Sequence, residues 1–113
     1  YHQLRPSVQF QQAREALLSY AAEFIQVVAW LERNRHAQTS SVNRLATSYN
    51  WKHVAEKAIK QYVPNGVLIA AALQMGLQFE HIEDTDNVHL NLSQEFLQIQ
   101  RLILTPCEVA TLD

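Results

Sequence analysis

The hydrophobic pattern of this chain changes its period at Gly76. Before Gly76 the apolar residues recur at the three- and four-residue spacing of helices; after it they alternate with polar residues, as in strands. A last segment, residues 94–104, returns to the helical spacing. The pattern therefore predicts three helices, a β-hairpin and a final helix, in that order.

The longest predicted helix covers residues 7–34, with Ser7 as its N-cap. Its apolar stripe has heptad spacing and consists of Phe10, Ala13, Leu17, Tyr20, Phe24, Val27 and Leu31. A second apolar set in the later part comprises Leu18, Ala21, Ile25, Val28 and Trp30. We expect the second half of this helix to be buried. The first half is more polar, and it is either a solvent-exposed start of the helix or a surface that pairs with another chain. In the second case a homodimer would form through Phe10, Leu17, Tyr20 and Phe24.

Two shorter helices are predicted on either side of a tight turn at Pro64. The first runs from residue 50 or 51 to residue 61 and places Lys52, Glu56 and Lys60 opposite its apolar face, with Glu56 and Lys60 forming a helical ion pair. The second covers residues 65–75, is apolar on nearly every side and ends at Gly76, so we expect it in the middle of the domain. The polar residues 36–50 before them are expected to form a connection with one helical turn at 42–46.

The hairpin register follows from burial of its apolar residues. Leu77 and Phe79 must share a face with Leu90 and Leu92, which places His81 on the inner face near Val88 and His89 outside, across from Glu80. The two imidazoles then lie on opposite sides, so no metal site is expected. Ser93 should cap the last helix, whose inward residues are predicted to be Phe96, Ile99 and Ile103, and residues 105–113 should form a tail.

These elements predict a single domain over residues 1–113, mainly α with one hairpin, in a winged-helix-like layout. The winged-helix-like core would span residues 41–92, preceded by the long helix and followed by the C-terminal helix over 93–104.

One part of the chain resembles a known group of sequences. The resemblance rests on Thr47-Ser48-Tyr49, Lys52-His53, Glu56, Tyr62-Val63, Asn65-Gly66, Ile69-Ala70-Ala71 and Gly76. Over residues 47–93 the chain is similar to small uncharacterised bacterial proteins of phages, plasmids and other mobile elements. This resemblance implies a compact bacterial domain and no particular activity.

Charge is distributed unevenly, although the net charge is only -2. Residues 33–60 carry six basic side chains and the single acid Glu56, a net of +5, whereas residues 80–113 have a net of -6. The basic part is also rich in serine, threonine and asparagine, a mixture suited to DNA phosphates. We predict phosphate contacts from Arg35, Arg44, Lys52, Lys57 and Lys60. The alternative interpretation is a solvated helix face and loop.

Several classes of protein are excluded or disfavoured. Two glycines leave no Walker loop, dinucleotide turn or nucleophile elbow, and one cysteine leaves no disulfide framework or multi-cysteine zinc site. No nucleophile accompanies His53 and Glu56, so we expect no enzyme, cofactor or small-molecule substrate. No membrane span or signal peptide is recognised, which predicts a cytoplasmic protein.

The resulting hypothesis is a non-enzymatic bacterial DNA-associated domain that contacts the DNA backbone with modest sequence selectivity. Sequence-specific reading is disfavoured because the helix over 65–75 offers almost no polar side chains and the hairpin tip, residues 83–86, is acidic. The alternative is a protein-interaction or oligomerisation module without nucleic-acid binding.

Overall fold

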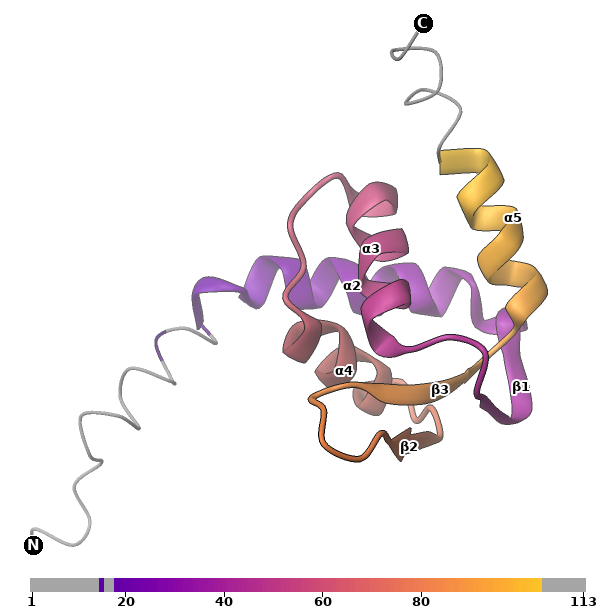
Figure 1. Ribbon diagram of the computed structural model, residues 1–113. Helices are drawn as coiled ribbons and strands as arrows, with labels where there is room; N and C mark the ends of the chain where they lie inside the picture. The colour runs from indigo at the N-terminus through magenta and orange to yellow at the C-terminus, as the bar shows by residue number, and fades with distance from the viewer. Residues whose placement is uncertain (1–14, 16–17, 105–113) are drawn as a thin grey trace, which may run out of the picture.

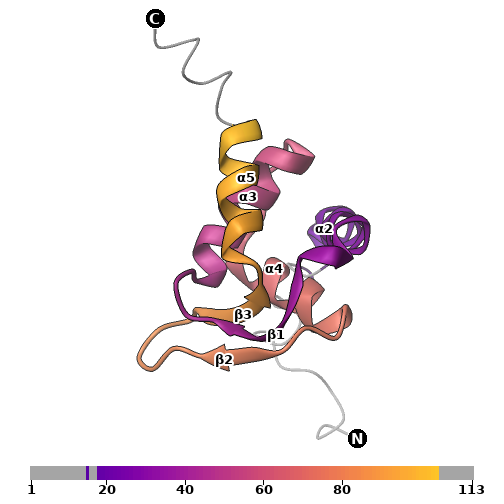
Figure 2. The ribbon, with the colours of Figure 1, turned by 90° about the vertical axis from the view of Figure 1, so that its right-hand side faces the viewer.

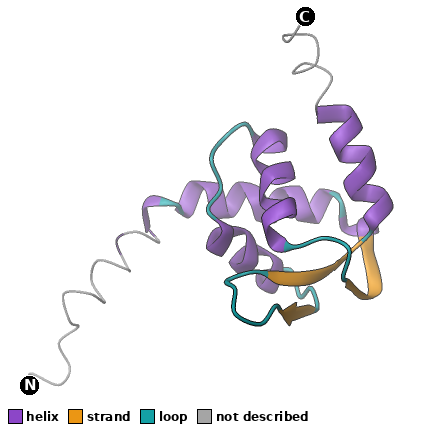
Figure 3. Ribbon diagram, viewed as in Figure 1, coloured by secondary structure: helices purple, strands orange, loops and turns teal. Residues whose placement is uncertain are grey.

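The chain folds into helices and one small antiparallel sheet in a computed structural model that describes residues 15 and 18–104. The elements are α2 (Ala21–Arg33), the 3-10 helix η2 (Arg35–Ala37), β1 (Gln38–Asn43), α3 (Ser48–Ile59), α4 (Asn65–Gln74), β2 (Phe79–His81), β3 (Val88–Leu92) and α5 (Gln94–Leu104). Figures 1 and 3 show that α2 crosses behind α3 and that α5 stands at the end opposite the start of α2. In Figure 2 the sheet lies along one side of the helices.

The hairpin has the register that its sequence predicts. Phe79 pairs with Leu90, Glu80 with His89, and His81 with Val88. The side-chain exposures follow the prediction less well, because Phe79 is 52% exposed and His81 is exposed too, although both were expected on the inner face. Their strand β2 lies at an edge of the sheet, so neighbouring strands flank it on one side only.

The third strand, β1, is missing from the sequence prediction. Residues 36–50 were expected to form a connection with a helical turn at 42–46, but β1 pairs with β3 and makes β3 the central strand, in the order β1-β3-β2. The side chain of Asn91 supports this pairing by donating a hydrogen bond from Nδ2 to the carbonyl of Thr39 over 2.8 Å. The sequence of β1 contains a single apolar residue, Val42, and three of its six side chains are exposed, so no apolar alternation indicates a strand.

The predicted long helix is interrupted. Residues 18–19 are helical, Tyr20 is a turn, and α2 begins at Ala21, so the helix is not continuous from residue 7 to residue 34 as predicted. Residues 1–14, with Phe10, and Leu17 lie outside the described residues. Val27, Trp30 and Leu31 are buried, but the expectation that Leu18 and Ile25 widen the buried face is wrong, because both are about two-thirds exposed.

The core lies where α2, α3, α4 and β3 meet. Trp51 is fully buried, and its ring stacks on Phe96 of α5 with centroids 6.1 Å apart. The apolar helix α4 is only partly in the middle of the domain. It buries Val67, Leu68, Ala71 and Ala72, but Leu73 remains exposed. Gly76 follows α4 with a φ of 78°, the left-handed conformation expected at a helix end.

The boundaries of α3 and α5 follow from their caps. Thr47 and Asn50 form a capping box, so α3 begins at Ser48, slightly earlier than predicted. Ser93 Oγ accepts a hydrogen bond from the backbone N–H of Phe96, and α5 covers the predicted residues.

The buried face of α5 differs from the prediction. Phe96 and Leu97 are buried, but Ile99 and Ile103, which were expected to face inward, are exposed, as is Leu102. Only the first turns of α5 are covered by the rest of the described domain. Within residues 15 and 18–104, no helix has the length and apolar character needed to cross a membrane.

Candidate functional site

Lys52 does not lie on a solvated face, which corrects the sequence prediction. Its side chain is 8% exposed, and its ammonium donates a hydrogen bond to Glu56 Oε2 over 2.9 Å. The same ammonium lies 4.8 Å from the ring centroid of Tyr62 and 5.5 Å from that of Tyr49. Because it is enclosed by a carboxylate and two rings, Lys52 is not available to a phosphate at the surface.

Glu56 is the acceptor for three donors. Besides Lys52 Nζ, it accepts from the backbone N–H of Val63 over 3.0 Å, and its Oε1 lies 3.1 Å from His53 Nδ1. Burial alone raises the pKa of Glu56, but the hydrogen bonds from Lys52, Val63 and His53 and the charge of Lys52 outweigh it and lower the pKa. His53 and Glu56, three residues apart on α3, are thus in direct contact.

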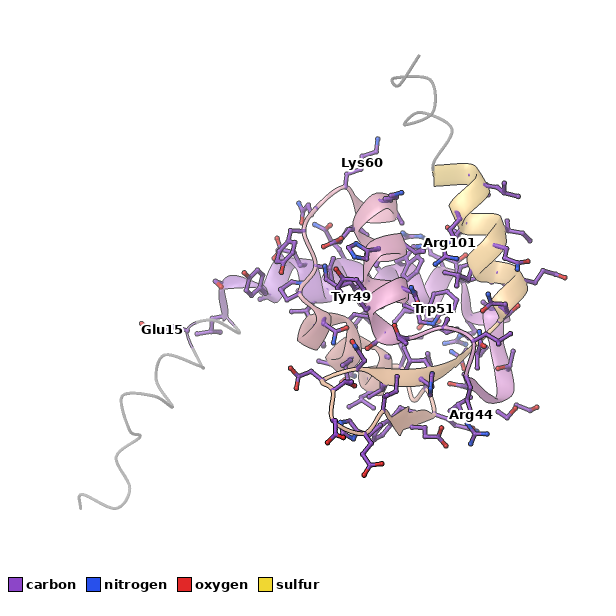
Figure 4. The ribbon with its side chains drawn as sticks, in the orientation of Figure 1. Glu15, Arg44, Tyr49, Trp51, Lys60 and Arg101 are labelled. Carbon is purple, nitrogen blue, oxygen red and sulfur yellow. The ribbon has the colours of Figure 1, made fainter. Side chains whose placement is uncertain are left out.

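The expected helical ion pair between Glu56 and Lys60 is absent from the described residues, where the carboxylate binds Lys52 instead. Lys60 lies past the end of α3 in the left-handed conformation, with a φ of 60°. Figure 4 shows its side chain extending from the end of α3 away from the domain.

Two further basic residues of the prediction are held in ion pairs at the surface. Arg44 forms a bidentate contact with Glu80, with nitrogen–oxygen distances of 2.8 and 2.7 Å. The hydrogen bond to Arg44 is the main cause that lowers the pKa of Glu80, and the bond to Glu80 raises that of Arg44. Arg35 pairs with Glu32. A phosphate would have to displace a carboxylate at each of these arginines.

A small basic groove lies between α3 and α5, which pack against each other. Its volume is about 80 Å³, and it is lined by Asn50, His53, Val54, Lys57, Gln100 and Arg101. Figure 4 shows Arg101 on α5 beside α3. Glu56 does not line this groove, but its Oε1 lies 3.1 Å from Nδ1 of the lining residue His53.

The groove has the donor set of an anion site. Guanidinium and ammonium groups supply charge, and the amides of Asn50 and Gln100 supply neutral hydrogen-bond donors. His53 adds a charge only when it is protonated, and its ring meets the ring of Tyr49 edge-on at 4.4 Å. Such a set matches the oxygens of a phosphate.

Sequence reasoning found Lys57 but missed Arg101. Arg101 is the single basic residue of the acidic last third, so it had no basic neighbours in the sequence. Only the packing of α5 on α3 brings it to Lys57. The available signal was its place on a predicted amphipathic helix, which does not reveal the neighbouring helix.

The remaining predicted surfaces lie elsewhere. The hairpin tip exposes Glu83, Asp84 and Asp86. Tyr20 and Phe24, the described members of the predicted dimer interface, are half-buried and line an apolar groove of about 250 Å³ with residues of α4. Within the described residues, no three histidine, cysteine, aspartate or glutamate side chains are grouped to hold a metal ion.

Comparison of the chain with protein-family models, with curated proteins and with solved structures finds no match. The resemblance over residues 47–93 therefore stays a prediction, and the function has to be argued from the geometry.

Proposed function

We propose that this chain is a winged-helix-like domain that associates with DNA without catalysing a reaction. The fold part of this proposal is supported by the order α2, β1, α3, α4, β2, β3 and by the sheet order β1-β3-β2. Helices that alternate with strands in this way place α3 and α4 as the helix pair and the β2–β3 hairpin as the wing. The strand β1, absent from the sequence prediction, adds to the likeness.

The observation that carries the DNA part is the basic groove between α3 and α5. Lys57 and Arg101 come from different helices, and both line this groove together with the amides of Asn50 and Gln100. Lys60 follows Lys57 three residues later at the end of α3, and we take these two residues and Arg101 as the cations of the α3–α5 edge of the domain. Phosphate oxygens on one DNA strand would bind along this edge, and the contacts would be independent of base sequence.

Specific reading of bases through α4 is not part of the proposal. The helix α4 has only two polar side chains, Asn65 and Gln74. The amide of Asn65 already donates to Asp86 O and Asn87 Oδ1. The acidic hairpin tip beside it would repel phosphates. Contacts limited to the α3–α5 edge predict weak, sequence-tolerant binding.

Salt dependence is the sharpest test, with fluorescently labelled random duplex DNA and the full chain. Three phosphate contacts predict a slope of about -2.7 in log K against log salt, so affinity should fall about 40-fold between 50 and 200 mM salt. Absence of any binding at 50 mM salt would overturn the proposal.

A pair of double variants separates the groove from net charge. Lys57→Gln with Arg101→Gln should leave one contact, and the fall in affinity over the same salt range should shrink to about 3- to 4-fold. Arg33→Gln with Arg35→Gln removes the same charge at the end of α2 and should leave the slope unchanged. If the two double variants lose affinity equally, net charge rather than the groove binds DNA.

A protein-interaction module is the second candidate, and the apolar surface favours it. Leu102 is 72% exposed, and Ile99 and Ile103 beside it on α5 are exposed as well. If this is the function, DNA binding is absent at low salt and Leu102→Ser abolishes capture of the partner.

A further inference from the structure

A second groove lies on the side of the domain formed by α2 and α4. It is lined by Tyr20, Ala21 and Phe24 from the start of α2 and by Val67 and Ala70 from α4. Its volume of about 250 Å³ is many times the ~30 Å³ that one water occupies in the liquid, and its lining is nearly all apolar. An open apolar groove of this size indicates a missing apolar occupant.

The charge around the groove restricts the occupant. Residues 61–79, which contain the whole of α4, include no charged side chain. The lining residues therefore offer an acidic or basic peptide no partner, and they favour large apolar side chains.

The chain itself carries such side chains beside the groove. Phe24 and Tyr20 belong to a heptad stripe whose later members, Val27 and Leu31, are buried in the core. The same spacing continues toward the N-terminus to Leu17 and Phe10, which lie outside the described residues. The described half of the stripe thus packs inside or against the core, and Phe10 and Leu17 are the apolar residues that continue it.

We propose that the groove receives Phe10 and its apolar neighbours from a second copy of this chain. The described residues before α2 lead away from the domain, and Figure 4 shows Glu15 far from its body. For Phe10 to enter the groove of its own chain, the backbone would have to turn back within residues 11–17, which contain none of the usual turn residues glycine, proline, asparagine, aspartate and serine. A two-fold arrangement instead fills both grooves at once, because each copy supplies one segment and one groove.

The apolar spacing indicates which residues would meet. Phe10 and Phe24 are two heptads apart in the sequence, and Leu17 lies midway between them. We place the two segments antiparallel, with Phe10 of one copy in the groove beside Phe24 of the other. This surface is distinct from the α3–α5 groove, so the inference is independent of the proposed DNA association.

The first experiment measures the mass of the full chain by sedimentation equilibrium over a range of concentrations. The wild type should approach twice the chain mass of 13.0 kDa. Ala70→Trp, which fills the groove from a half-exposed position, and Phe10→Ser should each weaken the dimer at least tenfold. Ile25→Ser removes an exposed apolar residue from α2 outside the groove lining and should leave the dimer intact.

A crosslinking experiment identifies the occupant. In a Cys107→Ser background, chains with Phe10→Cys and differently tagged chains with Ala70→Cys are mixed and oxidised. A disulfide that joins the two differently tagged chains supports the proposal. A wild type that stays at 13.0 kDa at every concentration overturns it. So does a chain with both cysteines that forms the disulfide only within itself.

Discussion

Replacing Glu56 by glutamine removes the charge that the Lys52 ammonium lies against. The side chains of Lys52 and Glu56 are only 8% and 18% exposed, and the carboxylate also accepts from Val63 N–H. Breaking a buried ion pair from one side leaves an uncompensated charge and typically costs 3–5 kcal/mol. Because Glu56 keeps some contact with water and glutamine keeps one acceptor oxygen, we expect about 3 kcal/mol.

The magnitude is large for a domain of this size, whose total stability is expected to be about 5–15 kcal/mol. Urea unfolding followed by tryptophan fluorescence measures it, since Trp30 and Trp51 are both buried. Lys52→Met alone should cost only about 1 kcal/mol, because methionine fills the space of the lysine stem and Glu56 keeps its contacts with Val63 N–H, His53 and water. The double variant should also lose only about 1 kcal/mol, which makes the coupling energy about 3 kcal/mol.

The pH dependence of the free energy of unfolding is a second test of the ion pair between Lys52 and Glu56. The folded pKa of Glu56 is lowered, so the unfolded chain binds more protons between the two pKa values, and stability falls as the pH falls. The difference between wild type and Glu56→Gln should stay constant above about pH 5 and shrink below the ordinary glutamate pKa of about 4.3. Additive single effects at pH 7, or a loss below 0.5 kcal/mol for Glu56→Gln, would refute the buried pair.

Three further predictions concern stability and are measured by the same urea unfolding. Gly76→Ala should destabilise the domain by about 1–2 kcal/mol; a Cβ there meets open space, so the cost comes from the left-handed φ of 78° alone. Gly66→Ala on α4 should instead stabilise it by about 0.4–1 kcal/mol. Thr47→Ala should cost about 1 kcal/mol through loss of the capping box, and Thr47→Ser should restore most of it. Asn91→Ala should cost about 2–3 kcal/mol, because its buried amide binds both the backbone N–H of Gln78 and the strand β1; an effect below 0.5 kcal/mol would contradict that role.

The sequence predicted the features that depend on neighbours along the chain. Ser93 caps α5 and Gly76 follows α4 because caps and left-handed turns are properties of a few consecutive residues. The pairing of Glu80 with His89 was also predictable, since apolar alternation in two strands joined by one turn leaves a single register that places both apolar sets on the same face.

Features that depend on distant packing were not predictable in this way. The strand β1 is polar and becomes a strand only because β3, about 50 residues later, supplies its hydrogen bonds. Exposure of Ile99 and Ile103 follows from how far the domain extends along α5, which the period of the helix does not encode.

The candidate site also has features that the sequence determines and features that only packing determines. Sequence alone determined that the cations of this chain are concentrated in residues 33–60, which is where the predicted phosphate contacts were placed. Tertiary structure decided which of them reach the surface. It encloses Lys52 between Glu56 and two tyrosine rings, and it brings Arg101 to Lys57 from another helix. The physical reason is that charge is a property of each residue, whereas burial and pairing depend on which segments, far apart in sequence, pack together.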